Sequence, residues 1–350
     1  MEILTLAVAF VVILVGAELF TNGIEWFGHK LGLAEGAVGS VLAAVGTALP
    51  ETMIPIIAIL VSTGASSSEV GVGAILGAPF MLATLAMFVT GVAVLIVGRG
   101  RPSGDVMRVN TQVLGHDMRV FGVAYAIAIG AAFLPVDPVW LTWIVAAVLI
   151  AIYAWYVKGH FEADPDTDAA DLMPLRLHRL DRAARLTNPA VPRLRVVNLQ
   201  VLVALGLIIA GAAFFVDSVE RIADELHVDG TLLALVVAPI ATELPEKANS
   251  VIWVRLGKDT LAMGNITGAM VFQSTIPTVV ALVFAPHVWV AASGSYVAFA
   301  SAGIAFLSAG LVFIPMARRG VLRGRGLLVG GLFYVGYLAL VIGVISGVIG

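Results

Sequence analysis

The sequence has no cysteine and few charged residues. Of its 350 residues, 12% are charged and 60% are hydrophobic. The lack of cysteine excludes disulfides, thiolate metal sites and cysteine nucleophiles. A soluble domain usually carries about 25% charged residues, so this chain has too few to cover a surface in water, and most of its surface is expected to face lipid. The net charge of −3 gives no reason to expect nucleic acid or an acidic partner.

Motifs of enzymes are also absent. The sequence contains no paired His-Glu metal motif, no Gly-x-Ser-x-Gly and no aspartate pair in facing apolar runs that would form a catalytic dyad. The six histidines fall in or near the expected loops, which argues against a histidine metal site. We therefore expect neither an enzyme nor a bound cofactor.

Ten apolar runs are long enough to cross a bilayer, which takes roughly 20 residues in a helix. The first run has no basic segment before it and no cleavage site after it, and is interpreted as a membrane span rather than a removed signal peptide. This predicts an all-α polytopic membrane protein. The expected spans are 3–24, 35–62, 69–97, 119–135, 138–157, 197–217, 230–254, 259–285, 289–315 and 327–349.

Basic residues predict the orientation of these spans. With the N-terminus outside, the inside loops hold 18 of the 20 lysines and arginines, as the positive-inside rule requires. Both termini are therefore expected outside. The long polar break at 159–196 becomes a cytoplasmic linker that joins two halves. The short chain and compact loops favour a prokaryotic cytoplasmic membrane, with the lipid bilayer as the surrounding partner.

Three segments of the first half recur in order in the second half. They lie 195, 195 and 191 residues apart, and they are 16–22 with 211–217, 47–51 with 242–246, and 73–78 with 264–269. A repeat of five spans, an odd number, enters the membrane from the opposite side in its second copy. Inverted repeats of this kind are typical of secondary transporters, whose binding site lies at the midplane between the copies.

This predicts three parts of the chain. Residues 1–158 form the first five-helix repeat, 159–196 the linker, and 197–350 the second five-helix repeat. The central regions of the repeats are expected at about 35–97 and about 230–285.

Glu51 and Glu246 stand near the middle of otherwise apolar spans. They end the matching segments 46–51, Gly-Thr-Ala-Leu-Pro-Glu, and 241–246, Ala-Thr-Glu-Leu-Pro-Glu. A carboxylate at that depth is costly and by default marks a functional site. The proline before each glutamate lacks an N–H and clashes with the carbonyl four residues back. We therefore predict that helices 2 and 7 are broken there, with freed carbonyls facing a polar cavity.

Two symmetry-related carboxylates with nearby carbonyl and hydroxyl oxygens form a cage of hard ligands suited to Ca²⁺. Without the ion, two close carboxylates repel each other and favour a bound proton, so that proton and divalent cation compete for the site. The alternative is that each Pro-Glu is a kink whose hydrogen-bonded acid serves only packing.

Gly-Thr-x-Leu-Pro-Glu in two inverted halves, with Gly-Asn-x-x-Gly in the following helix, resembles the alpha repeats of the cation/calcium exchanger superfamily, which includes the sodium/calcium exchangers. The resemblance covers about 16–90 and about 211–280. It implies that the two glutamates bind calcium with the help of the preceding threonines, Thr47 and Thr242. It also implies that the first and sixth helices gate access, and that the protein is a monomer.

The chain departs from the family pattern at several expected sodium ligands. Ala48 and Glu243 stand where the motif usually has serine. In the next helices the second copy keeps Asn265 and has Gln273 three residues after the motif, whereas the first copy has apolar residues throughout. Glu243 can pair with Lys247, four residues on, or act as a further cation or proton ligand. The candidate metal ligands are Glu51, Glu246, Thr47, Thr242, Glu243, Asn265 and Gln273.

These residues predict a secondary antiporter that exchanges Ca²⁺ for Na⁺ or H⁺ at a midplane two-glutamate site. The lost sodium ligands keep a divalent cation/proton exchanger open as the alternative. A cation channel is the competing class, but a channel does not need an inverted repeat with a proline-broken acidic centre.

Overall fold

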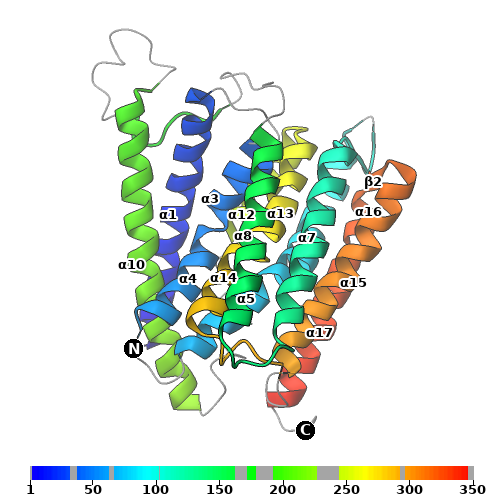
Figure 1. The fold of residues 1–350 in the computed structure, drawn as a ribbon. Coiled ribbons are helices and arrows are strands. Elements are labelled where there is room, and N and C mark those ends of the chain that lie inside the picture. The colour runs from blue at the N-terminus through cyan, green and yellow to red at the C-terminus, as the bar shows by residue number, and fades with distance from the viewer. Residues whose placement is uncertain are drawn as a thin grey trace.

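A computed structural model describes most of the chain. The described residues are 2–31, 38–62, 67–101, 103–161, 172–178, 192–226, 244–291 and 296–345. They form a bundle of long helices that lie side by side (Figure 1). The first half consists of α1 (Glu2–Lys30), η1 (Val38–Ala43), α3 (Ala44–Thr47), α4 (Leu49–Leu60), α5 (Ser67–Met81), η2 (Leu82–Ala86), α6 (Met87–Gly98), β1 (Val106–Met107), α7 (Thr111–Ala131) and α8 (Trp140–Phe161). The second half consists of α10 (Leu194–Leu226), α12 (Leu244–Arg255), α13 (Asp259–Gln273), α14 (Ile276–Phe284), α15 (Tyr296–Arg319), β2 (Leu322–Arg323), α16 (Gly324–Leu327) and α17 (Val329–Ile345).

The described residues contain eight helices long and apolar enough to cross a membrane, and nine if the bent segment 40–60 counts as one span. The expected span 230–254 is described only from Leu244 onward. Helix α1 begins and α17 ends at the same end of the bundle, the lower end in Figure 1. This arrangement requires an even number of crossings.

The expected start of the fourth span, residue 119, is wrong. Helix α7 begins at Thr111, where the Asn110 side chain caps it by accepting hydrogen bonds from the backbone N–H groups of Gln112 and Val113. The first two turns are too polar for a hydropathy window, but the cap makes them helical. The ninth expected span, 289–315, is also displaced, since its helix runs from Tyr296 to Arg319 and includes Pro315.

Helices α1 and α10 pack closely against each other at one edge of the bundle (Figure 1). A Cβ added at Gly16 would lie 2.9 Å from Ile208 Cγ1 and 3.1 Å from the Ala204 carbonyl oxygen. A Cβ added at Gly211 would lie 2.7 Å from Ile13 Cγ1 and 3.2 Å from the Ala9 carbonyl oxygen. The two sets of contacts are therefore equivalent: each residue that contacts Gly16 lies 195 residues after the residue that makes the same contact with Gly211. The two helices are antiparallel and related by a local two-fold axis.

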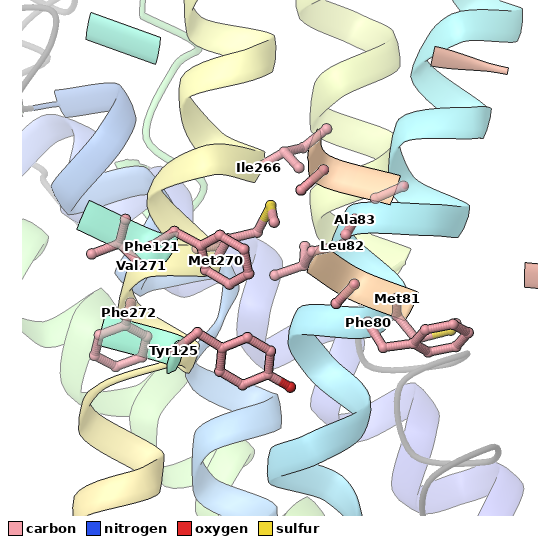
Figure 2. Close-up of a cluster of buried hydrophobic side chains, with 14 of the residues drawn as sticks. Phe80, Met81, Leu82, Ala83, Phe121, Tyr125, Ile266, Met270, Val271 and Phe272 are labelled. Atoms are coloured by element: carbon pink, nitrogen blue, oxygen red, sulfur yellow. The ribbon is translucent and has the colours of Figure 1, made fainter. Parts of the chain in front are cut away.

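The interior of the bundle is apolar where α5 and η2 meet α7 and α13. Figure 2 shows Leu82, Phe121, Tyr125 and Met270 gathered in this cluster, and all four side chains are buried. Leu82 therefore fills a place in the core rather than lining a polar cavity.

A short antiparallel ribbon ties two loops together at the other end of the bundle from the termini. Strand β1 pairs with β2, Val106 opposite Arg323. Asp105 lies beside the ribbon, where Arg325 Nε donates a hydrogen bond to Oδ2 at 2.7 Å and Arg323 lies 3.6 Å from Oδ1. The hydrogen bond from Arg325, aided by both positive charges, holds the pKa of Asp105 below its ordinary value.

Replacement of Gly211 by alanine is expected to destabilise the protein, because the new methyl group must push α1 away from α10. Such overpacking costs about 1–3 kcal/mol. The matched control is Gly206→Ala in the same helix, where an added Cβ meets nothing within 4 Å. Alanine favours a helix over glycine by about 1 kcal/mol, so the control should melt at the same or a higher temperature in detergent. A Gly211→Ala protein as stable as the control would contradict the close packing of these helices.

Acidification should weaken the interactions of Asp105 with Arg323 and Arg325, which stabilise the ribbon. Its pKa is lower in the folded protein than in the unfolded chain, whose aspartate titrates near pH 4. The stabilisation is therefore complete above about pH 4 and is lost as the pH falls through the lowered pKa. Asp105→Asn lacks this contribution at every pH, so its melting temperature should fall less than that of the wild type between about pH 5 and pH 3. Parallel losses in the two proteins would refute the assignment, and Asp224→Asn, an exposed site, serves as control.

Candidate cation-binding site

The helix that carries Glu51 is broken, as the sequence predicts. Its two parts, Ser40–Gly46 and Glu51–Leu60, are bent by 56° relative to each other. Ala48 is the N-cap of α4, with φ −82° and ψ 2°, and a proline occupies the first turn. Proline is tolerated there because the N–H that it lacks has no partner inside the helix.

This break places Glu51 in the first turn of α4, at a helix N-terminus inside the bundle. The side chain of Glu51 is 4% exposed. The positive end of the helix dipole favours a negative charge at this position. The break thus makes a buried carboxylate at this depth less costly.

Gln273, at the end of α13, reaches the same break. Its Nε2 donates a hydrogen bond of 3.2 Å to the Ala48 carbonyl, which also accepts one of 2.7 Å from Thr52 Oγ1. Because a carbonyl can only accept, the nitrogen of the amide must face Ala48. Gln273 Oε1 is buried and has no hydrogen-bond partner among the residues that the structure describes. An oxygen in this state is suited to a cation.

Asn265 is fully buried in the same helix. It precedes Gln273 by eight residues, which places the two amides about 12 Å apart along the helix axis. Asn265 therefore lies at a different depth from the break in the Glu51 helix.

The other candidate ligands fall outside the described part of the structure. Thr242 and Glu243 are not described, and for Thr47 and Glu246 the description covers the helices α3 and α12 but not the side chains. Helix α12 packs against α3 and α13. The helix with Glu246 thus lies beside the broken helix of Glu51. Within the described side chains, no three His, Asp or Glu gather as a metal site.

Two other charged residues of the spans have definite surroundings. Glu18 accepts a hydrogen bond of 2.7 Å from Arg176, and both side chains are exposed. Glu18 is therefore tied to the linker segment 172–178. Lys247 is 6% exposed, and its expected partner Glu243 lies outside the described residues.

Asp117 was not predicted from the sequence as a buried residue. It was assigned to a loop, because the span was expected to begin at residue 119, but it lies in α7 with 0% exposure. His116 and His160 were also expected in or near loops, and both lie in helices. His160 Nε2 is 3.1 Å from Asp117 Oδ1. The available signal was Asn110, a typical cap residue, which extends the helix to include Asp117.

The described residues contain eight helices long and apolar enough to span a membrane, together with a buried acid at a broken helix, and these features define a multi-pass membrane protein with a polar site in its interior. The family model described as "Sodium/calcium exchanger protein" matches residues 1–159 and 197–345. The chain belongs to this family.

Known proteins similar to the chain support the same placement. A putative antiporter CaxA from Alkalimonas amylolytica is 35% identical over 96 residues, which span 27% of this chain and 30% of the relative. The crystal structure of the H⁺/Ca²⁺ exchanger CAX superposes with a TM-score of 0.76 and 14% identity, over 99% of this chain and 85% of that chain. The sodium–calcium exchanger NCX_Mj gives 0.61 and 15% identity, over 97% of each chain. At these identities the two structures establish the fold alone.

Proposed function

We propose that the protein is a secondary active antiporter that exchanges Ca²⁺ for a monovalent cation, by alternating access to a site formed by Glu51 and Glu246. The observation that carries this proposal is the buried Glu51 at the break of its helix, with the amide of Gln273 on the same break. The family match supports it. So do the names of two structural neighbours, an H⁺/Ca²⁺ exchanger and a sodium–calcium exchanger.

An inverted five-helix repeat is part of the proposal. The reciprocal contacts of Gly16 and Gly211 support it, since an antiparallel helix pair with a local two-fold axis is what such a repeat requires of its first and sixth helices. In the resulting ten-span plan, Glu246 occupies the position in helix 7 that Glu51 occupies in helix 2. The glycine-lined contact of α1 with α10 then allows the pair to move together past the site, as a gate.

The two carboxylates carry most of the chemistry. A divalent cation neutralises both glutamates, and Gln273 Oε1 and freed backbone carbonyls complete a shell of oxygen ligands. Without the ion, repulsion between the carboxylates favours the uptake of monovalent cations or protons. The site therefore reorients loaded with one kind of ion or the other, and empty reorientation with two bare charges in a low dielectric is disfavoured.

Protons are the favoured counter-ion within this proposal. Ala74 and Ala78 of α5 and Leu82 of η2 occupy positions where the family pattern has polar residues, and all three are buried. They bring no side-chain oxygen to hold Na⁺. A proton needs only a carboxylate, so this loss harms proton coupling less than sodium coupling.

The decisive experiment uses the protein reconstituted in liposomes. Uptake of radioactive calcium is followed under an imposed pH gradient, an imposed Na⁺ gradient, or neither. The wild type should accumulate calcium under the pH gradient. In Glu51→Gln this rate should fall by more than about 10-fold, because the loss of even an outer contact of a metal site typically lowers affinity by about 10–100-fold.

The matched control is Glu225→Gln, the same change at an exposed residue near the end of α10, which should transport as the wild type does. Calcium accumulation under the Na⁺ gradient alone would show that the counter-ion is sodium rather than the proton. Calcium flux that runs only down its own gradient, with no dependence on a counter-ion, would reject the antiporter in favour of a channel.

A further inference from the structure

Asp117 lies at the centre of a polar cluster outside the glutamate site. Its carboxylate accepts hydrogen bonds from Thr267 Oγ1 at 2.6 Å, from Tyr156 OH at 3.0 Å and from Ser40 Oγ at 3.2 Å. His160 Nε2 completes the set at 3.1 Å. These partners come from α13, α8, η1 and again α8, so one carboxylate joins four segments of the bundle, including α7. No step proposed for the glutamate site uses this group.

Groups that can exchange a proton surround Asp117 on one side only. Segment η1 has no titratable residue, and α13 has only Asp259, which is held by Arg101 at 2.9 Å and by the backbone N–H of Arg108. Helix α15 carries its charges at its C-terminal end. Helices α7 and α8 supply the remaining titratable and charged groups, which are His116, Arg119, Tyr125, Tyr153, Tyr156, Lys158 and His160.

A histidine pair connects the cluster to the end of the bundle. His160 lies in the last turn of α8 and is 8% exposed. The His116 ring is 5.7 Å from the His160 ring, and it stacks on Tyr156 at 5.8 Å. Helix α7 begins and α8 ends at this same end, the upper end in Figure 1. A histidine can accept a proton on one ring nitrogen and release one from the other, so the pair offers a path from the surface to Asp117.

The contacts of Asp117 allow it to hold a proton without leaving another group unpaired. With the carboxylate charged, Oδ1 accepts from Tyr156 and His160, and Oδ2 accepts from the two hydroxyls. When one proton is taken up, it binds Nδ1 of His160 and the hydrogen on Nε2 passes to Oδ1, so that Oδ1 then donates to Nε2 and the imidazole stays neutral with its hydrogen on Nδ1. Tyr156 OH then has a second acceptor, the Ser40 carbonyl at 3.3 Å.

The cluster also lies at the crossing of η1 and α13. A Cβ added at Gly268 of α13 would collide with the Ser40 carbonyl oxygen, so backbone meets backbone there. Ser40 and Thr267, one on each side of this crossing, both donate to Asp117 Oδ2. Hydrogen bonds to a charged acceptor are roughly twice as strong as neutral ones. The charge on Asp117 therefore sets how firmly η1 is held against α13.

We propose that Asp117 and His160 form a second, proton-binding site, reached through His116 and His160 from the upper end of the bundle, which controls the η1–α13 crossing. The site takes one proton, held on Asp117 Oδ1 and shared with His160 Nε2. It is separate from the cation site, and it stands whether or not the chain exchanges calcium.

The test is an infrared pH titration of the purified protein in lipid, on a background of Glu51→Gln and Glu246→Gln that removes the glutamates of the cation site. Carbonyl bands of protonated carboxylic acids should appear on acidification, because the chain keeps many other acidic residues. Asp117→Asn should abolish one of these bands, which the difference between the two titrations isolates. His160→Gln keeps the carboxyl but removes the ring that shares the proton, so it should move the midpoint of the band. His287→Gln, at an exposed histidine far from the cluster, should leave it unchanged.

Transport provides the second readout, with the cation-site glutamates intact. The wild-type rate should change with pH through the midpoint found by infrared titration, and Asp117→Asn should lose this transition and keep the rate of the acid form. If Asp117→Asn does not fold, His160→Gln decides by its shifted midpoint. A titration that neither variant alters, with every carbonyl band retained in Asp117→Asn, would show that Asp117 only holds the helices together.

Discussion

The carbonyl of Ala48 stands at the break of the helix that carries Glu51, and both Gln273 and Thr52 donate to it. Inside a membrane a helix can be interrupted only where its freed polar groups find partners in the protein. This requirement places α13 against the break, so that the second oxygen of the Gln273 amide is brought to the site. It also fixes the first turn of α4, and with it the position of the buried Glu51. In the proposed mechanism, cation binding therefore depends on how the freed polar groups of this interrupted helix are paired.

The same helix is held a second time on the other side of its break. Ser40 in η1 packs backbone to backbone on Gly268 and donates to Asp117. Glu51 and Asp117 therefore act on two ends of one bent segment, and both act through α13, which contributes Gln273 at one end and Thr267 at the other. A proton at Asp117 and a cation at Glu51 would be linked by the rigid body that they share.

The sequence predicted the features that depend on local chemistry. The broken helix at Pro50 and the α-helical, multi-pass class follow from backbone sterics and hydropathy, and the repeat offset of 195 reappears in the contacts of Gly16 and Gly211. Asp117 was missed, since a hydropathy window counts an aspartate against a span and ignores the cap at Asn110. Its partners come from α8, η1 and α13, up to 150 residues away, and no local sequence pattern predicts contacts over such a separation. The partner of Glu18 also lies far away in the chain, since Arg176 belongs to the linker.

Equilibrium binding of radioactive calcium to the purified protein tests most directly whether Glu51 and Glu246 share one cation. We expect saturable binding of a single ion per chain, because one divalent charge neutralises two carboxylates. This binding should be lost in Glu51→Gln and equally in Glu246→Gln, and retained in Glu225→Gln. Full binding in either of the first two variants, or two independent ions in the wild type, would contradict a shared two-glutamate site.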